Sequence, residues 1–317
     1  MLTNGHLERT VIDWIPGMPP IKLGDMSSFV RTTDPDDFGL RFNEEEANNC
    51  TKANALILNT FDELEADVLA ALRAEYARIY TIGPLGTLLN HAADAIGGGL
   101  SLWKQDTECL AWLDTQQPRS AVYVNFGSLT VMTPERLAEF AWGIAATGCP
   151  FLFVVRENLV PGGPAALPPE FVVETDGRRC LATWCSQEQV LRHPAVGCFL
   201  THSGWNSKCE SVASGVPMVC WPVFADQYIN RKYACESWDV GLRLDEEVRR
   251  EQVTAQVKQV MESEEMRQDA ARWKAKADHL TRTCRAWWKS SVLSPPTPRR
   301  LKPEKYCSET NILKQSK

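Results

Sequence analysis

Residues 196–215 read Val-Gly-Cys-Phe-Leu-Thr-His-Ser-Gly-Trp-Asn-Ser-Lys-Cys-Glu-Ser-Val-Ala-Ser-Gly, and this stretch says most about the fold. The apolar run from Val196 to His202 predicts a buried strand, and Ser207–Ser214 is typical of a helix that ends at Gly215. The chain therefore turns directly from strand to helix. Free N–H groups at the start of such a helix point outward, and the helix dipole favours negative charge. The stretch predicts an anion site at the end of a strand.

Short apolar runs and helical patterns alternate around this stretch. One helix is expected after the first run, with Thr133 as its cap and Pro134 in its first turn. Ser186 and Gln189 have the spacing of a capping box at the start of a short helix. Buried strands are expected at residues 121–126, 151–155, 180–184, 216–223 and 240–244.

Further helices are expected from Asp226 and from about Glu251. Such alternation implies a parallel sheet covered by helices on both faces, which is an α/β fold. Ligands of such folds bind beyond the carboxyl ends of the strands.

Composition and charge exclude several classes of protein. The 317 residues are 44% hydrophobic and 23% charged, with a formal net charge of −6. This balance argues against nucleic acid as a partner, since phosphate binding needs a basic face. No apolar run has the length of a membrane-spanning helix, and the first residues do not resemble a signal peptide. The 11 cysteines contain no Cys-x-x-Cys pair, so we expect reduced thiols in a cytoplasmic protein.

The two ends of the chain differ from its centre. Residues 55–59 and 79–83 are expected to be strands, with a helix between them that begins near Leu64. Residues 281–317 hold nine Lys or Arg against two acidic residues and lack apolar periodicity. We expect this basic tail to be disordered, and a localisation or membrane patch is the alternative.

Several side chains of the central block suit a nucleotide. Trp184 at a strand's end could stack on a base, although a buried core position is the plainer interpretation. Glu210 has the spacing of a capping box with Ser207. Asp226 could serve as a helix N-cap. His193 is expected to be structural, and no set of residues has the spacing of a metal site.

The block from Trp184 to Gln227 closely resembles the donor-binding box of plant UDP-dependent glycosyltransferases, with Ser186 where that family usually has proline. The resemblance covers about residues 8–280 and implies a GT-B-type fold of two Rossmann-like domains. It also implies UDP-glucose as donor, a small hydroxylated acceptor, and no metal or other cofactor. By resemblance, the donor-binding residues are Ser128, Trp184, Cys185, Gln187, His202, Trp205, Asn206, Ser207, Glu210, Asp226 and Gln227.

The resemblance also assigns a role to each part of the donor site. Diphosphate contacts are implied for Ser128, His202, Asn206 and Ser207, and the helix terminus with His202 would offset the charge without a metal. The base would stack on Trp184 and meet the backbone of Cys185, with Gln187 assisting at the uridine. The ribose would bind Glu210. The sugar would bind Asp226 and Gln227, and glutamine at this position resembles glucose-preferring members.

We expect four segments: residues 1–86 as the remnant of an acceptor-binding domain, 87–106 as a linker, 107–280 as a complete donor-binding domain, and 281–317 as the tail. The family's catalytic base is a histidine that follows an apolar strand, and His6 does not have that setting. No catalytic residue is therefore assigned.

The leading interpretation is a truncated monomeric glucosyltransferase that is weak or inactive alone. A non-catalytic UDP-sugar-binding module is the alternative. A dehydrogenase is disfavoured, because no Gly-x-Gly-x-x-Gly follows a strand.

Overall fold

The computed structural model describes residues 5–76, 78–86, 103–162 and 167–292, with side chains as far as residue 279. By contacts between residues, 1–281 form one unit and 282–317 another. The predicted linker falls mostly on residues 87–102, which lie outside the described ranges, so the predicted division at residues 87–106 stays a prediction.

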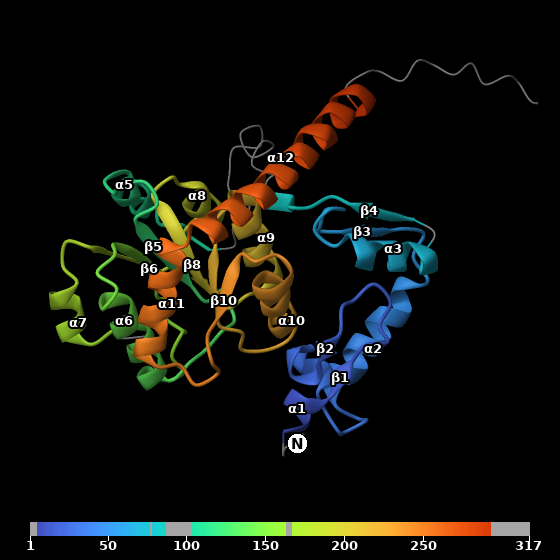
Figure 1. Ribbon diagram of the computed structural model, residues 1–317, viewed down its shortest axis with the longest axis horizontal. Helices are drawn as coiled ribbons and strands as arrows, with labels where there is room; N and C mark the ends of the chain where they lie inside the picture. Colours follow the sequence, from blue (N-terminus) through green and yellow to red (C-terminus); the bar gives the residue numbers. More distant parts are fainter. Residues whose placement is uncertain (1–4, 77, 87–102, 163–166, 293–317) are drawn as a thin grey trace, which may run out of the picture. The chain divides into compact units, whose positions relative to one another are not determined.

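A six-stranded sheet in the order β10-β9-β8-β5-β6-β7 organises the first unit, and every pair in it is parallel (Figure 1). The predicted parallel α/β architecture is therefore confirmed. The strands are β5 Ala121–Asn125, β6 Phe151–Val154, β7 Arg179–Ala182, β8 Val196–Thr201, β9 Met218–Cys220 and β10 Gly241–Arg243.

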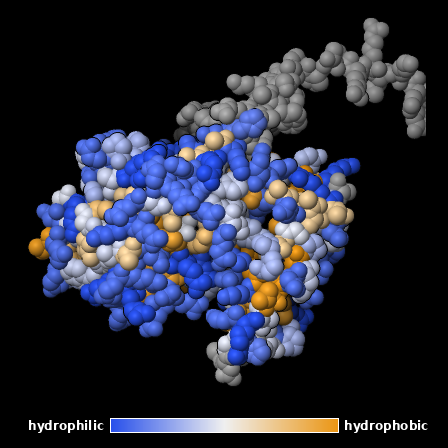
Figure 2. Space-filling view, in the orientation of Figure 1, coloured by the Kyte–Doolittle hydropathy of each residue, from blue (hydrophilic) through white to orange (hydrophobic). Residues whose placement is uncertain are grey.

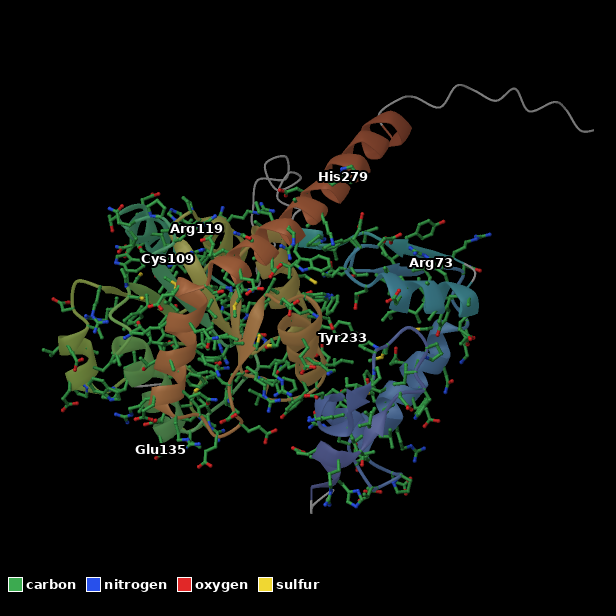
Figure 3. The ribbon with its side chains drawn as sticks, viewed as in Figure 1. Arg73, Cys109, Arg119, Glu135, Tyr233 and His279 are labelled. Carbon is green, nitrogen blue, oxygen red and sulfur yellow. The ribbon has the colours of Figure 1, made fainter. Side chains whose placement is uncertain are left out.

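Helices pack on both faces of this sheet, because neighbouring residues of each buried strand point to opposite faces. Tyr123 belongs to one apolar cluster and Val124 to the other. The Tyr123 cluster also includes Cys109 and, at its edge, Tyr233, both labelled in Figure 3. Helices that contribute to it are α5 Glu108–Asp114, α8 Gln187–Arg192, α9 Trp205–Ser214 and α12 Glu264–Val292. Helices on the Val124 face are α6 Pro134–Ala145, α7 Pro169–Glu174 and α11 Arg250–Glu262.

The order of the strands creates a switch point between β5 and β8. From β5 the chain proceeds to β6 and β7 on one side, and then returns to place β8 on the other side. At such a point the loops that follow the two strands diverge and leave a crevice at the carboxyl edge of the sheet. The predicted anion site follows β8, so the topology puts it at this crevice.

The N-terminal part contains two small sheets. Antiparallel β1 Val11–Ile12 and β2 Ile21–Lys22 form one, and parallel β3 Leu56–Leu58 and β4 Ile79–Thr81 form the other. The helices are α1 His6–Arg9, α2 Phe38–Cys50 and α3 Ala66–Glu75, with short 3-10 turns at Leu23–Asp25 and Ser28–Val30. Apolar residues gather on the surface over α2 and β2 (Figure 2). On α2, Phe38 and Phe42 are 83% and 53% exposed.

Most expected helix starts are confirmed, and the capping box predicted at the start of α8 is wrong. Thr133 caps α6 through a hydrogen bond from the Arg136 N–H (3.3 Å), and Pro134 follows it. Gly215 ends α9 in the left-handed conformation with φ 71°. Ser186 occupies the N-cap position of α8, but its side chain makes no capping bond. The predicted capping box with Gln189 is therefore absent.

The predicted disordered tail is corrected for residues 281–292, because α12 continues as far as Val292. The sequence from Glu264 has no glycine or proline before Pro295, so nothing in it breaks the helix. Residues 293–317, which complete the predicted tail, lie outside the described ranges.

Two expectations from composition can be compared with the described residues. The nine cysteines whose side chains the structure describes are all free thiols. No helix within the described ranges is both long and apolar enough to cross a membrane.

The contact between α6 and α11 yields a stability prediction. A Cβ added at Gly143 would lie 2.6 Å from the Val253 Cβ and 2.8 Å from the Arg250 carbonyl oxygen. Replacing a helical glycine by alanine normally stabilises by about 1 kcal/mol. Here we expect Gly143→Ala to lower the free energy of unfolding by about 1–3 kcal/mol, because the helices must separate. Urea unfolding followed by circular dichroism measures it, and a stabilised variant would contradict this packing.

Candidate functional site

The start of α9 forms the centre of the candidate site. β8 ends at Thr201, and the first helical hydrogen bond runs from the Lys208 N–H to the Gly204 carbonyl (3.0 Å). The N–H groups of residues 205–207 precede this bond and have no partner within the helix. Ser203 adopts a left-handed conformation with φ 64°, which is uncommon for a residue other than glycine. The predicted turn from strand to helix is present, although the helix begins at Trp205 rather than at Ser207.

His202 lies between two glycines. A Cβ at Gly127 would approach the imidazole Cε1 to 2.5 Å, and one at Gly204 would approach Nε2 to 2.5 Å. Gly127 also has φ 71°, a conformation that favours glycine. Both its backbone conformation and its contact with the imidazole therefore require glycine there. The loops after β5 and β8 therefore touch through this ring. Ser128, exposed in the loop after β5, lies at the same edge of the sheet.

The imidazole of His202 is neutral near pH 7. Burial lowers its pKa to about 4, a backbone hydrogen bond at Asn125 opposes that shift, and the Arg156 charge adds to it. Its Nδ1 is buried and has no hydrogen-bond partner among the described residues. A buried, unpaired ring nitrogen beside free N–H groups is a feature that a bound ligand would satisfy.

A polar network joins the predicted residues behind this turn. The Gln187 Nε2 donates to the Ser207 Oγ (2.9 Å) and to the Glu210 Oε2 (2.7 Å). The Gln187 Oε1 accepts from the Asn125 Nδ2 (3.0 Å). The amide of Gln187 is thus held by protein groups, and it orients Ser207 and Glu210.

Glu210 does not serve as a capping residue. The N-cap of α9 is Gly204, so Ser207 lies inside the first turn and cannot form the capping box considered above. Burial raises the pKa of the Glu210 carboxyl to about 7, while the Gln187 hydrogen bond lowers it. Glu210 is half-buried, and within the described ranges it forms no ion pair. Desolvating such a carboxylate is costly, and groups of this kind are concentrated at binding sites.

Two further members of the network escaped sequence analysis. The Asn125 Nδ2 also donates to the Tyr123 hydroxyl (2.8 Å), which lies 3.4 Å from the Cys185 Sγ. Tyr123 and Asn125 share one face of β5, since side chains alternate along a strand. The signal in the sequence that could have identified them is the presence of two polar side chains on one face of an otherwise apolar strand.

Trp184 lies two residues beyond the end of β7 and is half-buried. Its ring meets that of Trp103, which is 54% exposed, with the centroids 5.9 Å apart and the planes tilted by 39°. The Trp184 carbonyl accepts from the Asp106 N–H (2.8 Å). Trp184 is therefore not fully buried, and its assignment to the base stays a prediction.

Asp226 and Gln227 lie at the start of α10 Gln227–Lys232. Asp226 is exposed and makes no capping bond; instead its Oδ2 accepts from the Asn230 Nδ2 (2.8 Å). Gln227 is buried, and its Oε1 accepts from the Val223 and Phe224 N–H groups (2.8 and 3.2 Å). Its amide nitrogen is the end that remains for a ligand.

Trp205 and Asn206 contact the N-terminal part. The Trp205 Nε1 donates to the Asn59 carbonyl (2.8 Å), and the Asn206 Oδ1 accepts from the Asn59 Nδ2 (3.1 Å).

His193 lies 3.1 Å from the Asp114 carboxylate, in keeping with the structural role expected for it.

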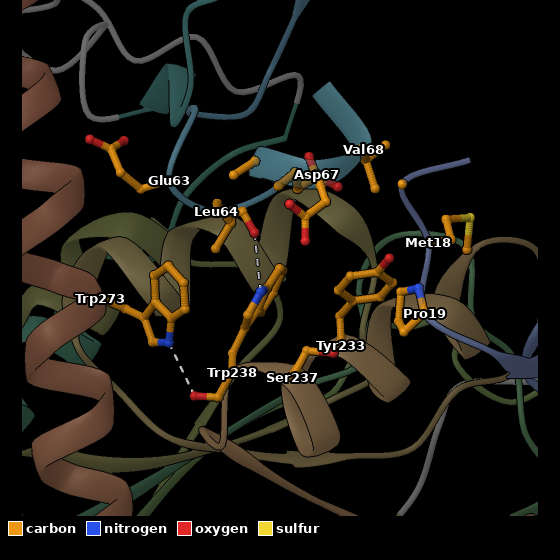
Figure 4. Close-up of a pocket in the computed structure, with 13 residues that line it drawn as sticks. Met18, Pro19, Glu63, Leu64, Asp67, Val68, Tyr233, Ser237, Trp238 and Trp273 are labelled. Atoms are coloured by element: carbon orange, nitrogen blue, oxygen red, sulfur yellow. Dashed lines mark hydrogen bonds between the residues drawn. The ribbon is translucent and has the colours of Figure 1, made fainter. Parts of the chain in front are cut away.

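The structure contains a cavity of about 580 Å³ that Leu64, Asp67 and Tyr233 help to line (Figure 4). Tyr233, Trp238 and Trp273 contribute its aromatic part, and none of the predicted donor-binding residues lines it. Trp238 closes one side by donating from Nε1 to the Leu64 carbonyl (3.2 Å). Within the described ranges, no three His, Cys, Asp or Glu residues converge as a metal site.

Similarity to known proteins fits this geometry. The sequence profile described as "UDP-glucoronosyl and UDP-glucosyl transferase" matches residues 45–275. The 7-deoxyloganetin glucosyltransferase of Gardenia jasminoides is 52% identical over 287 residues, which are 89% of this chain and 60% of that protein. The (R)-mandelonitrile beta-glucosyltransferase of Prunus dulcis is 50% identical over 285 residues, covering 88% and 59%. The chain therefore spans about 60% of the length of these curated relatives.

Solved structures show the same fold. Phytolacca americana UGT2, complexed with UDP-2fluoro-glucose and pterostilbene, gives a TM-score of 0.74 at 28% identity, covering 88% of this chain and 62% of that one. A UDP-glucosyltransferase from Polygonum tinctorium capable of glucosylating indoxyl gives 0.74 at 30% identity, covering 91% and 64%. The predicted GT-B-type fold is confirmed.

The raised pKa of Glu210 yields a prediction about stability and pH. Its pKa is about 7 in the folded chain against an ordinary value of 4.5, so the folded chain holds the proton more tightly. Stability should therefore fall as pH rises through this window, by on the order of 1–3 kcal/mol.

We expect Glu210→Gln to remove this loss. The stability of the variant relative to the parent chain should therefore be higher at pH 8 than at pH 5. Denaturant unfolding at both pH values measures it, with the exposed α7 residue Glu170→Gln as control. An equal effect of Glu210→Gln at both pH values would show that the carboxyl does not titrate in this way.

Proposed function

Since this chain belongs to the family of UDP-glucoronosyl and UDP-glucosyl transferases, we propose that residues 107–280 bind UDP-glucose and present it for transfer to a hydroxyl of a small plant metabolite. The observation that carries this proposal is the unpartnered start of α9 beside His202, at the switch point of the sheet. Anions bind at such helix termini, and nucleotides bind at such switch points.

The diphosphate is assigned to the turn after β8. The N–H groups of residues 205–207 supply backbone donors, and the side chains of Ser128, Asn206 and Ser207 supply further ones. His202 is neutral without ligand, so the unliganded site relies on the helix dipole and not on an imidazolium. A bound diphosphate would raise the pKa of His202 and favour the form in which both ring nitrogens donate.

The nucleoside is assigned to Trp184 and Glu210. Base stacking on an aromatic ring contributes about 1–3 kcal/mol, and the half-buried Trp184 is the ring proposed for it. The Cys185 backbone would read the edge of the base. The Glu210 carboxylate would accept the two ribose hydroxyls, which would favour its charged form. Gln187 would act indirectly at the uridine, since its amide already holds Ser207 and Glu210.

The sugar is assigned to Asp226 and Gln227, which begin the helix α10. The exposed carboxylate of Asp226 would accept hydrogen bonds from sugar hydroxyls. Gln227 would donate through Nε2 only, because its Oε1 already accepts two backbone N–H groups. Glucose is proposed as the preferred sugar because two of the curated relatives are named glucosyltransferases.

The proposed transfer is a direct displacement with inversion. The acceptor oxygen forms a bond to the anomeric carbon while the bond from that carbon to the UDP oxygen breaks. The leaving UDP takes the electron pair, and the donors at the start of α9 stabilise its charge. No residue of this chain is assigned as the base that takes the acceptor proton, since His6 lies exposed in the short helix α1.

We further propose a metal-free site in a monomeric cytoplasmic protein. The N–H groups and the dipole of the helix terminus would stabilise the charge of the diphosphate, which is the role that a metal cation has in other sites. The free thiols of the described cysteines agree with a reducing compartment.

Calorimetric titration with UDP-glucose, paired with a product assay, tests this proposal. We expect saturable binding of UDP-glucose and of UDP. If neither UDP-glucose nor UDP bound, the proposed binding of the donor would be refuted. The expectation that the 317-residue chain transfers little glucose alone stays a prediction, and binding without any product would favour the non-catalytic module.

A substitution in the sugar subsite tests the assignment of Asp226. Asp226→Ala should weaken UDP-glucose binding about 10-fold, since a hydrogen bond to a charged group contributes about 1.5–3 kcal/mol. UDP affinity should stay within about 2-fold, because UDP lacks the sugar. Calorimetry with both ligands measures it, and the exposed Asp36→Ala serves as control. Equal losses for UDP and UDP-glucose would refute the assignment.

A further inference from the structure

Asn59 connects the N-terminal part to the start of α9. It follows β3 directly, within the segment expected to be the remnant of the acceptor-binding domain. Its carbonyl accepts from the Trp205 Nε1 (2.8 Å), and its Nδ2 donates to the Asn206 Oδ1 (3.1 Å). One residue therefore meets two consecutive residues of the proposed diphosphate turn.

The side-chain amide of Asn59 is itself fixed. Its Oδ1 accepts from the Leu85 N–H (2.9 Å). A Cβ at Gly83 would come within 2.6 Å of the same Oδ1, so the chain makes room for this amide by having glycine there. Because the oxygen end faces Leu85, the nitrogen end is the one that reaches Asn206.

The direction of these bonds determines which end of Asn206 is available. An asparagine amide has an acceptor end and a donor end. Asn59 occupies the acceptor end of Asn206, which leaves the Asn206 Nδ2 to donate elsewhere. A diphosphate offers only acceptors near neutral pH, so only this orientation of Asn206 would attract it.

We propose that Asn59 is a positioning residue for the donor diphosphate: through its hydrogen bond to Asn206 it turns the donor end of that amide toward the bound anion. This inference rests on the proposed function, because it assumes that Asn206 contacts the diphosphate. It also means that UDP binding to the donor-binding domain depends on a residue of the N-terminal part.

A purely structural role for Asn59 predicts a different result. A residue that only holds β3 against α9 would, when changed, disturb the whole nucleotide site. Uridine and UDP would then lose affinity alike. A positioning residue for the diphosphate affects UDP alone, since uridine has no phosphate.

The test compares UDP and uridine binding to Asn59→Ala and Asn59→Asp of this chain by calorimetry at constant pH and salt. Asn59→Asp retains an acceptor for the Leu85 N–H but cannot donate to Asn206, and its charge repels the anion. We expect UDP affinity to fall about 3- to 10-fold for Asn59→Ala and further for Asn59→Asp. Uridine affinity should change less than about 2-fold.

Controls separate the possible outcomes. Asn54→Ala, exposed before the same strand, should bind both ligands like the parent chain. In an Asn206→Ala background, Asn59→Ala should cause no further loss of UDP affinity, since the two side chains act in series.

Normal UDP affinity of folded Asn59 variants, or equal losses of UDP and uridine, would overturn this inference while leaving the proposed function intact. Failure of the parent chain to bind UDP would overturn both. Circular dichroism establishes that each variant is folded.

Discussion

The contact of the His202 ring with Gly127 and Gly204 is the constraint on which the candidate site depends. It closes the gap between the loops after β5 and β8, the two strands at the switch point of the sheet. A side chain at either glycine would overlap the imidazole, so the loops could not meet. Because they meet, the N–H groups at the start of α9 and the loop that carries Ser128 share one edge of the sheet. The proposed anion site is thus a consequence of backbone geometry, and side chains would add further contacts to it.

Next to that turn, polar side chains of the candidate site lie where burial disfavours their charged forms. Glu210, Gln187, Asn125 and Tyr123 form a network inside the layer between the sheet and α9. Burial raises the pKa of the Glu210 carboxyl and lowers that of the His202 imidazole. Both shifts disfavour the charged forms in the unliganded chain. The charge of a bound diphosphate would oppose the shift of His202, and hydrogen bonds from ribose hydroxyls would oppose the shift of Glu210. Burial of ionisable groups lowers the stability of the folded chain, and such groups are typical of binding sites.

The sequence predicted the parallel sheet and the start of α6, because apolar runs, Thr133 and Pro134 act locally. It also brought together Ser207, Glu210 and Gln187 through a family resemblance, and their direct hydrogen bonds agree with that grouping. Neither the order of the strands nor the contact of Gly127 with His202 is local, so spacing alone could not reveal them. Asn59 was missed for the same reason, since its partner lies 147 residues away in sequence. The capping box proposed for Ser207 failed because α9 begins at Trp205.

The central claim is that the start of α9, beside His202, holds the diphosphate of a UDP-sugar. A crystal structure of this chain soaked with UDP tests it most directly. The account predicts density for the two phosphates against the N–H groups of residues 205–207, with the uracil on Trp184 and the ribose at Glu210. Density for UDP in the cavity lined by Tyr233, Trp238 and Trp273, with the turn after β8 empty, would contradict it.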